Sequence, residues 1–236
     1  IKTIEEATNL KKETREQLKK DFSFQNITIT SVEEGEGVKK YLFTLNDQEH
    51  IEAVLMYHDY GLSLCISSQV GCNMGCAFCE SGRRKKVRNL TTEEMVEQIL
   101  QIEESCGERI RHVVVMGIGE PFDNYDNVCK MIQIINHPKG LNIGARHITV
   151  STCGIVPKIR EFSDFPYQVN LAVSLHAPND TLRKALMPIA KVYPLKELME
   201  ALEEYEKKTS RRLTFEYILL KNVNDKEEQA RELVSL

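Results

Sequence analysis

Cys72, Cys76 and Cys79 fall within eight residues, in the stretch CNMGCAFC. Thiolates are the ligands that hold iron–sulfur clusters, and three of them on one loop can wrap one face of a four-iron cubane. The fourth iron then lacks a protein ligand and is open to the amino and carboxylate groups of S-adenosylmethionine. Electron transfer from such a cluster cleaves the cofactor's sulfonium bond and releases a 5′-deoxyadenosyl radical. The spacing therefore predicts a [4Fe-4S] cluster that acts on S-adenosylmethionine.

A zinc site or a chance cluster is the alternative interpretation of these cysteines. A structural zinc ion takes four closed ligands, and no further Cys or His follows Cys79 within zinc-finger distance. Seven cysteines in 236 residues are also too few and too unevenly spaced for a disulfide framework. We therefore expect a cytoplasmic protein that uses thiolates for chemistry.

Composition limits the remaining possibilities. The chain is 42% hydrophobic and 28% charged, as expected of one globular domain with a small appendage. It contains no apolar run of about 18 residues and begins without an apolar signal-peptide core, so we expect neither a membrane span nor export.

A basic run at Arg83–Arg88 stands out against the net charge of −4. Five of its six residues are Lys or Arg, whereas the whole chain is too acidic to bind a polyanion by bulk electrostatics. The run is either a solvated loop or, beside the cysteines, a surface that contacts RNA phosphates.

The amino-terminal part has two patterns. Residues 3–22 resemble a helix, with Ile4, Ala7, Leu10 and Leu18 near one face. Short β-prone runs follow and predict a small antiparallel extension before a further strand at Leu62–Ser67; these runs are Ile27–Thr30, Lys39–Leu45 and Ile51–Tyr57. We therefore expect an amino-terminal unit over residues 1–60.

Strands and helices alternate over residues 61–236. After Leu62–Ser67 the expected strands are His112–Met116, His147–Val150, Gln168–Leu175 and Leu213–Leu219. The expected helices are Thr91–Ser105, which a capping box opens, Tyr125–Ile135, Val156–Phe162, Pro194–Lys208 and Glu227–Leu236. Strands that are apolar on both faces are typical of a buried parallel sheet. The pattern predicts an α/β fold, a partial (β/α) barrel with chemistry at the carboxyl ends of its strands.

A glycine-rich turn, MGIGEP, follows the second of these barrel strands. Such a turn lets the backbone approach a ligand closely, and the Glu120 carboxylate can accept hydrogen bonds from the ammonium of a bound cofactor. By itself the Gly-x-Gly-Glu pattern is equally compatible with a plain strand-to-helix turn.

Together these segments resemble one family, the radical S-adenosylmethionine RNA adenine methyltransferases, which modify carbon 2 of an adenine in 23S ribosomal RNA and in some transfer RNAs. The likeness runs across nearly the whole chain and rests on Cys65–Cys72, Arg88–Thr91, Met116–Pro121, Ile148–Gly154, Leu171–Asn179, Phe215–Leu220 and Val223–Asp225. The proline after Glu120 makes this motif resemble the carbon 2 group more than a sister group of antibiotic-resistance enzymes, which modify carbon 8.

The resemblance assigns roles to residues of this chain. It implies that the cluster ligands are Cys72, Cys76 and Cys79. It implies that the contacts to S-adenosylmethionine come from Gly119, Glu120, Ser151, Ser174, Leu175 and His176.

Two further residues match the family's catalytic positions. Cys65 matches an upstream catalytic cysteine, and Glu52 matches a proposed acid–base glutamate. Without the family, Glu52 would be a strand-surface carboxylate and Cys65 a small buried hydrophobe. His176 would equally fit a core histidine.

The family's reaction needs a methyl carrier. Carbon 2 of adenine is electron-poor and has no lone pair to attack a methyl sulfonium, so these enzymes first methylate a cysteine near their own carboxyl end. A second S-adenosylmethionine supplies the radical that removes hydrogen from that methyl group, and the carbon radical adds to the adenine. Cys65 would then release the product by forming a disulfide with the carrier.

The carrier cysteine lies in a carboxyl-terminal segment that this sequence does not contain. Either the chain is a shortened version of a longer protein, which the unfinished barrel favours, or it is a relative without the carrier. The resemblance also implies an RNA partner, an external electron donor such as flavodoxin or ferredoxin, and no membrane. A radical maturase acting on a peptide or small molecule and an inactive RNA-binding or metal-binding relative are the alternative functions.

Overall fold

A computed structural model describes residues 3–22 and 25–236 of the chain. Its strands are β1 (Ile27–Gly35), β2 (Val38–Leu45), β3 (His50–His58), β4 (Gly61–Cys65), β5 (Gln69–Val70), β6 (Arg88–Asn89), β7 (Ile110–Val115), β8 (Ile148–Thr152), β9 (Asn170–Ser174) and β10 (Leu213–Glu216). Its α-helices are α1 (Lys12–Asp21), α2 (Thr92–Cys106), α3 (Tyr125–Asn136), α4 (Val156–Phe162), α5 (Asp180–Leu186), α6 (Leu195–Thr209) and α7 (Glu227–Val234).

The described residues form one eight-stranded sheet in the order β1-β2-β3-β4-β7-β8-β9-β10. Strands β1 to β4 pair antiparallel, whereas β4, β7, β8, β9 and β10 pair parallel. The predicted α/β partial barrel is confirmed. The predicted antiparallel extension is continuous with the barrel, because β3 pairs directly with β4. The division of the chain at residue 60 stays a prediction.

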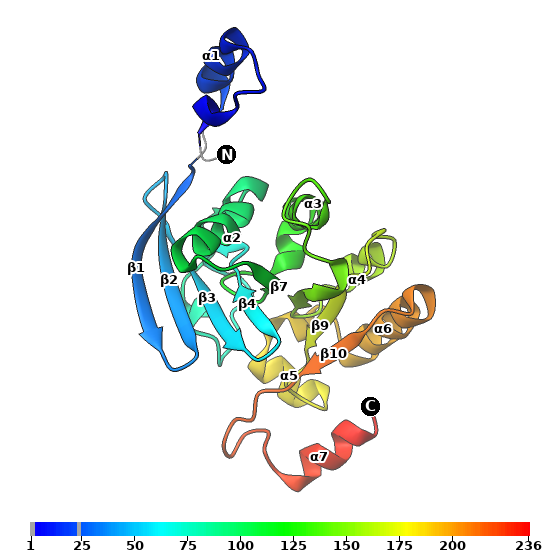
Figure 1. The fold of residues 1–236 in the computed structure, drawn as a ribbon. Coiled ribbons are helices and arrows are strands. Elements are labelled where there is room, and N and C mark those ends of the chain that lie inside the picture. Colours follow the sequence, from blue (N-terminus) through cyan, green and yellow to red (C-terminus); the bar gives the residue numbers. More distant parts are fainter. Residues whose placement is uncertain (1–2, 23–24) are drawn as a thin grey trace.

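Helices cover one side of the curved sheet. Figure 1 shows α2, α3, α4 and α6 in a row along that side, with α1 standing apart at one end of the molecule and α7 at the other. The strand residues that face these helices are apolar and buried; they include Ile51, Leu64, Val113, Val150 and Leu171. Burial of this continuous apolar face against the helices is the main stabilising term of the fold.

The opposite face of the sheet carries the polar strand residues. Side chains alternate along a strand, and paired residues of neighbouring strands point to the same side. One row of partners across the sheet is Val54, Cys65, Val114, Thr149 and Asn170. The next row toward the carboxyl ends contains Ser151, Ala172 and Thr214, and beyond it Ser174 pairs with Glu216. The sheet therefore gathers its polar groups on the face away from the helices.

The prediction of a single helix over residues 3–22 is wrong. A short 3-10 turn at Ile4–Glu6 is separated from α1, and α1 has no buried residue. A second difference is α5, which the sequence did not predict; the Asn179 side chain caps it by accepting from the Leu182 backbone nitrogen at 3.0 Å. Strand β10 also ends at Glu216, earlier than expected, because the Ile218 nitrogen donates to the His176 ring instead of continuing the sheet.

Helix α2 joins the two parts of the sheet through buried polar side chains. Glu97 accepts from the backbone nitrogens of Asn26 and Ile27 at 2.8 and 3.1 Å, at the start of β1. The next residue, Gln98, accepts from the Ser67 nitrogen at 2.9 Å and donates to the Ser67 carbonyl at 3.1 Å. The helix therefore fixes β1 and the chain after β4 to one rigid element.

Replacing Glu97 tests this connection. Glu97→Ala removes the acceptor from two backbone donors, so we expect the free energy of unfolding to fall by about 2 kcal/mol. Urea denaturation followed by circular dichroism measures the change. The control is Glu93→Ala on the exposed side of the same helix, which should stay within about 0.5 kcal/mol of the parent. Equal losses in the two variants would contradict the assignment.

Candidate cluster and cofactor site

The cysteine loop leaves the carboxyl end of β4 and is closed at its base by backbone pairing. Strand β5 pairs antiparallel with β6, the Cys72 nitrogen donates to the Arg84 carbonyl at 3.0 Å, and the Val87 nitrogen donates to the Val70 carbonyl at 2.8 Å. Gly71 lies at this base with φ +72°, and a Cβ there would sit 2.3 Å from the Lys85 carbonyl oxygen. Only glycine allows the two segments to approach so closely.

The three predicted ligands are available as free thiols. Cys72 is buried, Cys76 and Cys79 are half-buried, and none forms a disulfide. Burial, with the neighbouring Cys79 and Cys72, raises the pKa of Cys76 to about 12, so iron binding must displace a proton from this thiol. Within the described residues, no three His, Cys, Asp or Glu side chains converge on one ion position. A cubane does not need that convergence, because each thiolate binds a different iron, and the residues fit such a cluster.

An apolar wall supports the cysteine loop. Residues of the loop and of the α5 region pack in one cluster: Met74, Cys76, Phe78, Cys153, Ala177, Leu186 and Met187. The Ala77 nitrogen donates to the Leu186 carbonyl at 2.8 Å. The Phe78 and His176 rings contact each other edge-on, with 4.7 Å between their centroids. The aromatic residue before the third cysteine thus connects the predicted cluster ligands to a predicted cofactor contact.

Glu120 is almost completely buried, with 3% of its surface exposed. Its carboxylate accepts from the Phe122 nitrogen at 3.0 Å, the Thr152 hydroxyl at 2.7 Å and the Cys153 nitrogen at 2.7 Å. A carboxylate offers about four acceptor positions. The Cys153 thiol lies at the fourth, so the predicted ammonium would replace a weak donor there. Burial raises the pKa of Glu120, and a cation bound beside it would favour the ionised form.

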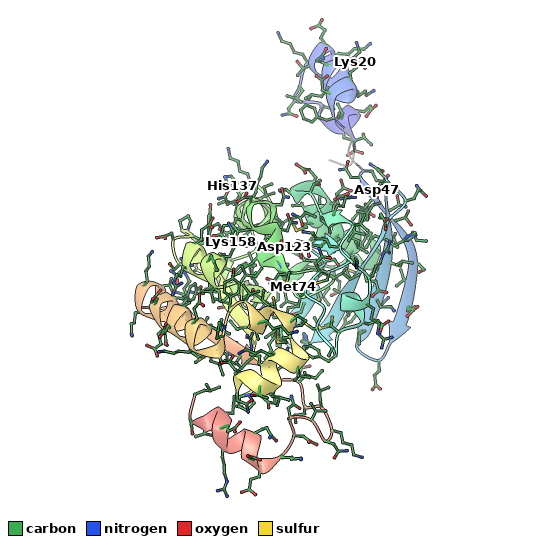
Figure 2. All side chains as sticks on the ribbon, turned by 180° about the vertical axis from the view of Figure 1, so that it is seen from behind. Lys20, Asp47, Met74, Asp123, His137 and Lys158 are labelled. Carbon is green, nitrogen blue, oxygen red and sulfur yellow. The ribbon has the colours of Figure 1, made fainter. Side chains whose placement is uncertain are left out.

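Gln69 connects the Glu120 turn to the cysteine loop. Its side-chain oxygen accepts from the Glu120 nitrogen at 2.9 Å, and its amide nitrogen donates to Asp123 at 2.8 Å. The Lys86 ammonium donates to the same Asp123 oxygen at 2.6 Å. At Gly119, with φ +114°, a Cβ would lie 2.6 Å from the Gln69 Cβ. Figure 2 shows Asp123 and Met74 in the central part of the molecule, far from Lys20 on α1.

Two predicted cofactor serines converge on a carboxylate that sequence reasoning did not select. The Ser151 hydroxyl donates to Glu216 at 2.7 Å and the Ser174 hydroxyl to the same oxygen at 3.3 Å. Glu216 is the last residue of β10. Its position at the carboxyl end of a barrel strand is the sequence feature that could have identified it as a site residue. Its backbone carbonyl also accepts from the nitrogens of Leu175 and His176. The Leu175 side chain is buried in the core, so only its backbone is placed to meet a ligand.

His176 is held in an unusual backbone conformation, with φ +53° and 7% exposure. Its Nδ1 accepts from the Ile218 nitrogen at 3.0 Å, and its carbonyl accepts from the Asn224 amide at 2.8 Å. Burial, with the nearby Arg183 charge, lowers the pKa of His176 to about 4. The ring is therefore neutral at physiological pH and carries its proton on Nε2, as a hydrogen-bond donor.

Cys65 and Glu52 lie on the polar face of the sheet. Cys65 pairs with Val54, and Glu52 is two residues before Val54 on the same side of β3. The Glu52 side chain is 44% exposed and lies 3.5 Å from the Lys40 ammonium. Burial raises the pKa of Cys65 to about 11, so at neutral pH it is a thiol. The structure thus brings these two residues to the site's face, and their catalytic roles stay predictions.

The basic run forms ion pairs with neighbouring carboxylates. Lys86 contacts Asp123 at 2.6 Å, and Arg88 contacts Asp47 at 2.6 Å and Glu94 at 2.8 Å. Arg84 pairs with Glu49, and Arg83 with Glu80 at 3.2 Å. Most of the positive charge is thereby neutralised within the fold. The backbone of the run closes the cysteine loop, which favours a structural role over an open phosphate-binding surface.

Known proteins share this arrangement. A sequence profile of the radical SAM superfamily matches residues 66–234. The chain belongs to this superfamily. Membership implies a [4Fe-4S] cluster and S-adenosylmethionine as cofactors, as the cysteine spacing predicted. A crystal structure of a radical SAM methyltransferase from Sphaerobacter thermophilus has a TM-score of 0.93 and 41% sequence identity, covering 99% of this chain and 70% of that one.

Curated relatives narrow the family. Proteins named "Probable dual-specificity RNA methyltransferase RlmN" are 53% identical over 242 residues in Listeria welshimeri and 51% identical over 240 residues in Spiroplasma citri. The alignments cover 100% of this chain but only 66% and 70% of the relatives, so the chain spans about two thirds of their length. Within the superfamily the chain belongs to this methyltransferase family.

No helix in the described part of the chain is long and apolar enough to span a membrane.

Gly71→Ala tests the closed base of the cysteine loop. The new Cβ would collide with the Lys85 carbonyl, so we expect the anaerobically reconstituted variant to hold less than half of the parent's iron per chain. Gly107→Ala is the matched control, because Gly107 has φ +71° and nothing within 4 Å of a new Cβ. The control should lose about 1 kcal/mol of stability and keep its iron. Normal iron content in both variants would rule out the close approach as a requirement.

The raised pKa of Cys65 predicts its reactivity. In protein without a cluster, the alkylation rate of Cys65 should rise about tenfold per pH unit from pH 8 to pH 10, because only the thiolate reacts. Quenched iodoacetamide labelling with peptide mass spectrometry measures this rate. Free cysteine in the same tube should level off near its ordinary pKa of about 8.5. A Cys65 profile that levels off together with free cysteine would refute the burial effect.

Proposed function

We propose that this chain is the cluster- and cofactor-binding part of an RNA methyltransferase that modifies carbon 2 of an adenine in 23S ribosomal RNA and in transfer RNA. One observation carries the proposal: the cysteine loop, Glu120 and the Ser151–Ser174–Glu216 group all lie at the carboxyl ends of one set of parallel strands. The RNA substrate is supported by the names of relatives that are 51–53% identical across the chain.

Each group of site residues has its own part in this proposal. Cys72, Cys76 and Cys79 hold the cluster, which supplies the electron that starts radical chemistry on S-adenosylmethionine. Glu120 and the Gly119 backbone would hold the cofactor's ammonium. Ser151, Ser174, the Leu175 backbone and the neutral His176 ring line the rest of its site.

On this proposal the full-length protein carries the methyl group on a cysteine outside the chain described here. That cysteine receives the methyl group, and the adduct of its methylene radical with adenine loses one electron and the carbon 2 proton. The Cys65 thiolate then attacks the carrier sulfur: the S–S bond forms, the bond from that sulfur to the methylene carbon breaks, and the carbon keeps the electron pair and takes a proton to become the product's methyl group. That step needs the Cys65 thiolate, so proton removal from a thiol with a pKa of about 11 accompanies it. Glu52, on the same face, is the proposed acid–base group. A cytoplasmic flavodoxin or ferredoxin serves as the electron donor.

The test uses the full-length protein, anaerobically reconstituted with iron and sulfide. With S-adenosylmethionine, a reductant and unmodified 23S or transfer RNA, we expect 2-methyladenosine by nucleoside mass spectrometry. Cys76→Ser should hold less iron and give no product. Cys65→Ala should keep its iron and give less than one per cent of the product, because it lacks only the release step. Absence of a methylated nucleoside in both RNAs would refute the proposal.

RNA dependence separates the alternatives. A maturase for a peptide or small molecule would cleave S-adenosylmethionine but would not methylate either RNA. An inactive metal-binding relative would contain zinc without iron after anaerobic purification.

A further inference from the structure

Arg183 on α5 is completely buried, with 0% of its surface exposed, and is the largest side chain buried to this degree in the described residues. Its guanidinium donates to three backbone carbonyls: Nη2 to Cys153 at 2.8 Å and Ser174 at 3.2 Å, and Nε to Leu175 at 3.3 Å. The remaining nitrogen, Nη1, is buried and has no hydrogen-bond partner in the described part of the chain. Among the same residues Arg183 forms no ion pair; the charge of Asp180, three residues earlier on α5, acts on it only from beyond that distance.

This arrangement leaves a charge without a counter-charge. Arginine cannot lose its proton in a protein, and burying an unpaired charge is strongly unfavourable. Three carbonyl dipoles offset part of the cost, and one donor is left over. A negative charge bound nearby would offset more of this cost through space.

The position of Arg183 identifies that anion. Helix α5 packs on the cysteine loop, where Leu186 accepts the Ala77 nitrogen, and Arg183 contacts Gly154 so closely that a Cβ there would lie 3.2 Å from Nη2. Its carbonyl partners are Cys153, which packs in one apolar cluster with Cys76, and Ser174 of the proposed cofactor site.

We propose that Arg183 is a positioning residue for the iron–sulfur cluster, whose negative charge its buried guanidinium compensates through space. The inference rests on the proposed cluster site. A cubane held by three thiolates is net negative and gains one more negative charge on reduction. A fixed positive charge beside it stabilises the reduced form more than the oxidised form, and so raises the reduction potential.

The measurement is the midpoint potential of the reconstituted full-length protein, followed by electron paramagnetic resonance without S-adenosylmethionine. For Arg183→Met we expect the equilibrium constant for one-electron reduction to fall at least tenfold, which corresponds to about 59 mV. Arg183→Lys keeps the charge and should stay within threefold of the parent. An unchanged potential in Arg183→Met with normal iron content would overturn the inference.

Arg211→Met is the matched control. Arg211 also donates to backbone carbonyls, those of Phe162 and Phe165, and also has a buried nitrogen without a partner among the described residues. It precedes β10, at the opposite end of the parallel strands from the cysteine loop. The control should lose stability and keep the parent potential. An equal shift in the control would show that the Arg183 effect comes from general destabilisation.

Two further outcomes are informative. If Arg183→Met takes up no cluster, Arg183→Lys decides, and a tenfold fall in that variant would overturn charge compensation. If Arg183→Met keeps the parent potential but binds S-adenosylmethionine more weakly in equilibrium dialysis, the cofactor carboxylate is the anion and the inference fails. Failure of the parent protein to take up iron would refute the proposed function itself.

Discussion

The in-register pairing of the parallel strands is the constraint on which the site depends. Because paired residues share a face, the register that buries Ile148, Val150 and Leu171 against the helices also places Ser151, Ser174 and Glu216 on the opposite face. A shift of one residue in any of these strands would exchange the two sets. The apolar core and the polar site are therefore specified by the same alternation.

Hydrogen bonds of buried side chains then fix the loops at the strand ends. Gln69 accepts from the Glu120 nitrogen and donates to Asp123, while Gln98 holds Ser67 from helix α2. The cysteine loop and the glycine-rich turn thus share a rigid support before any cofactor binds. Such preorganisation is what electrostatic stabilisation of a bound ligand requires, because the protein dipoles need not reorient.

The site contains buried groups of opposite charge. A buried carboxylate at Glu120, a buried guanidinium at Arg183 and a neutral His176 lie around the cysteine loop, all within one apolar setting. An amino acid cofactor that carries both an ammonium and a carboxylate, bound to an anionic cluster, complements this distribution. The ion pairs of the basic run add to the frame around the loop and leave little free positive charge there.

The sequence by itself determined the elements and the class of chemistry. Cysteine spacing, the Gly-x-Gly-Glu turn and the alternation of apolar runs are local signals, and they predicted the cluster loop, the parallel barrel and nearly every helix. The helix predicted over residues 3–22 is divided, because Ile4 and Ala7 are buried around a 3-10 turn before α1 begins at Lys12. Helix α5 was missed because a single capping asparagine opens only a short helix. Both errors arise because a local sequence pattern does not show what a segment packs against.

Only the tertiary structure decided which groups meet. Glu216 joins the two serines because β8, β9 and β10 end side by side, although it lies 65 residues beyond Ser151 in the chain. Arg183 looks like an ordinary surface arginine on a short helix until α5 packs against the cysteine loop. The basic run looks like a phosphate-binding patch until Asp47, Glu49 and Asp123 approach it. Charge, burial and hydrogen-bond partners depend on neighbours distant in sequence, and local periodicity carries no information about them.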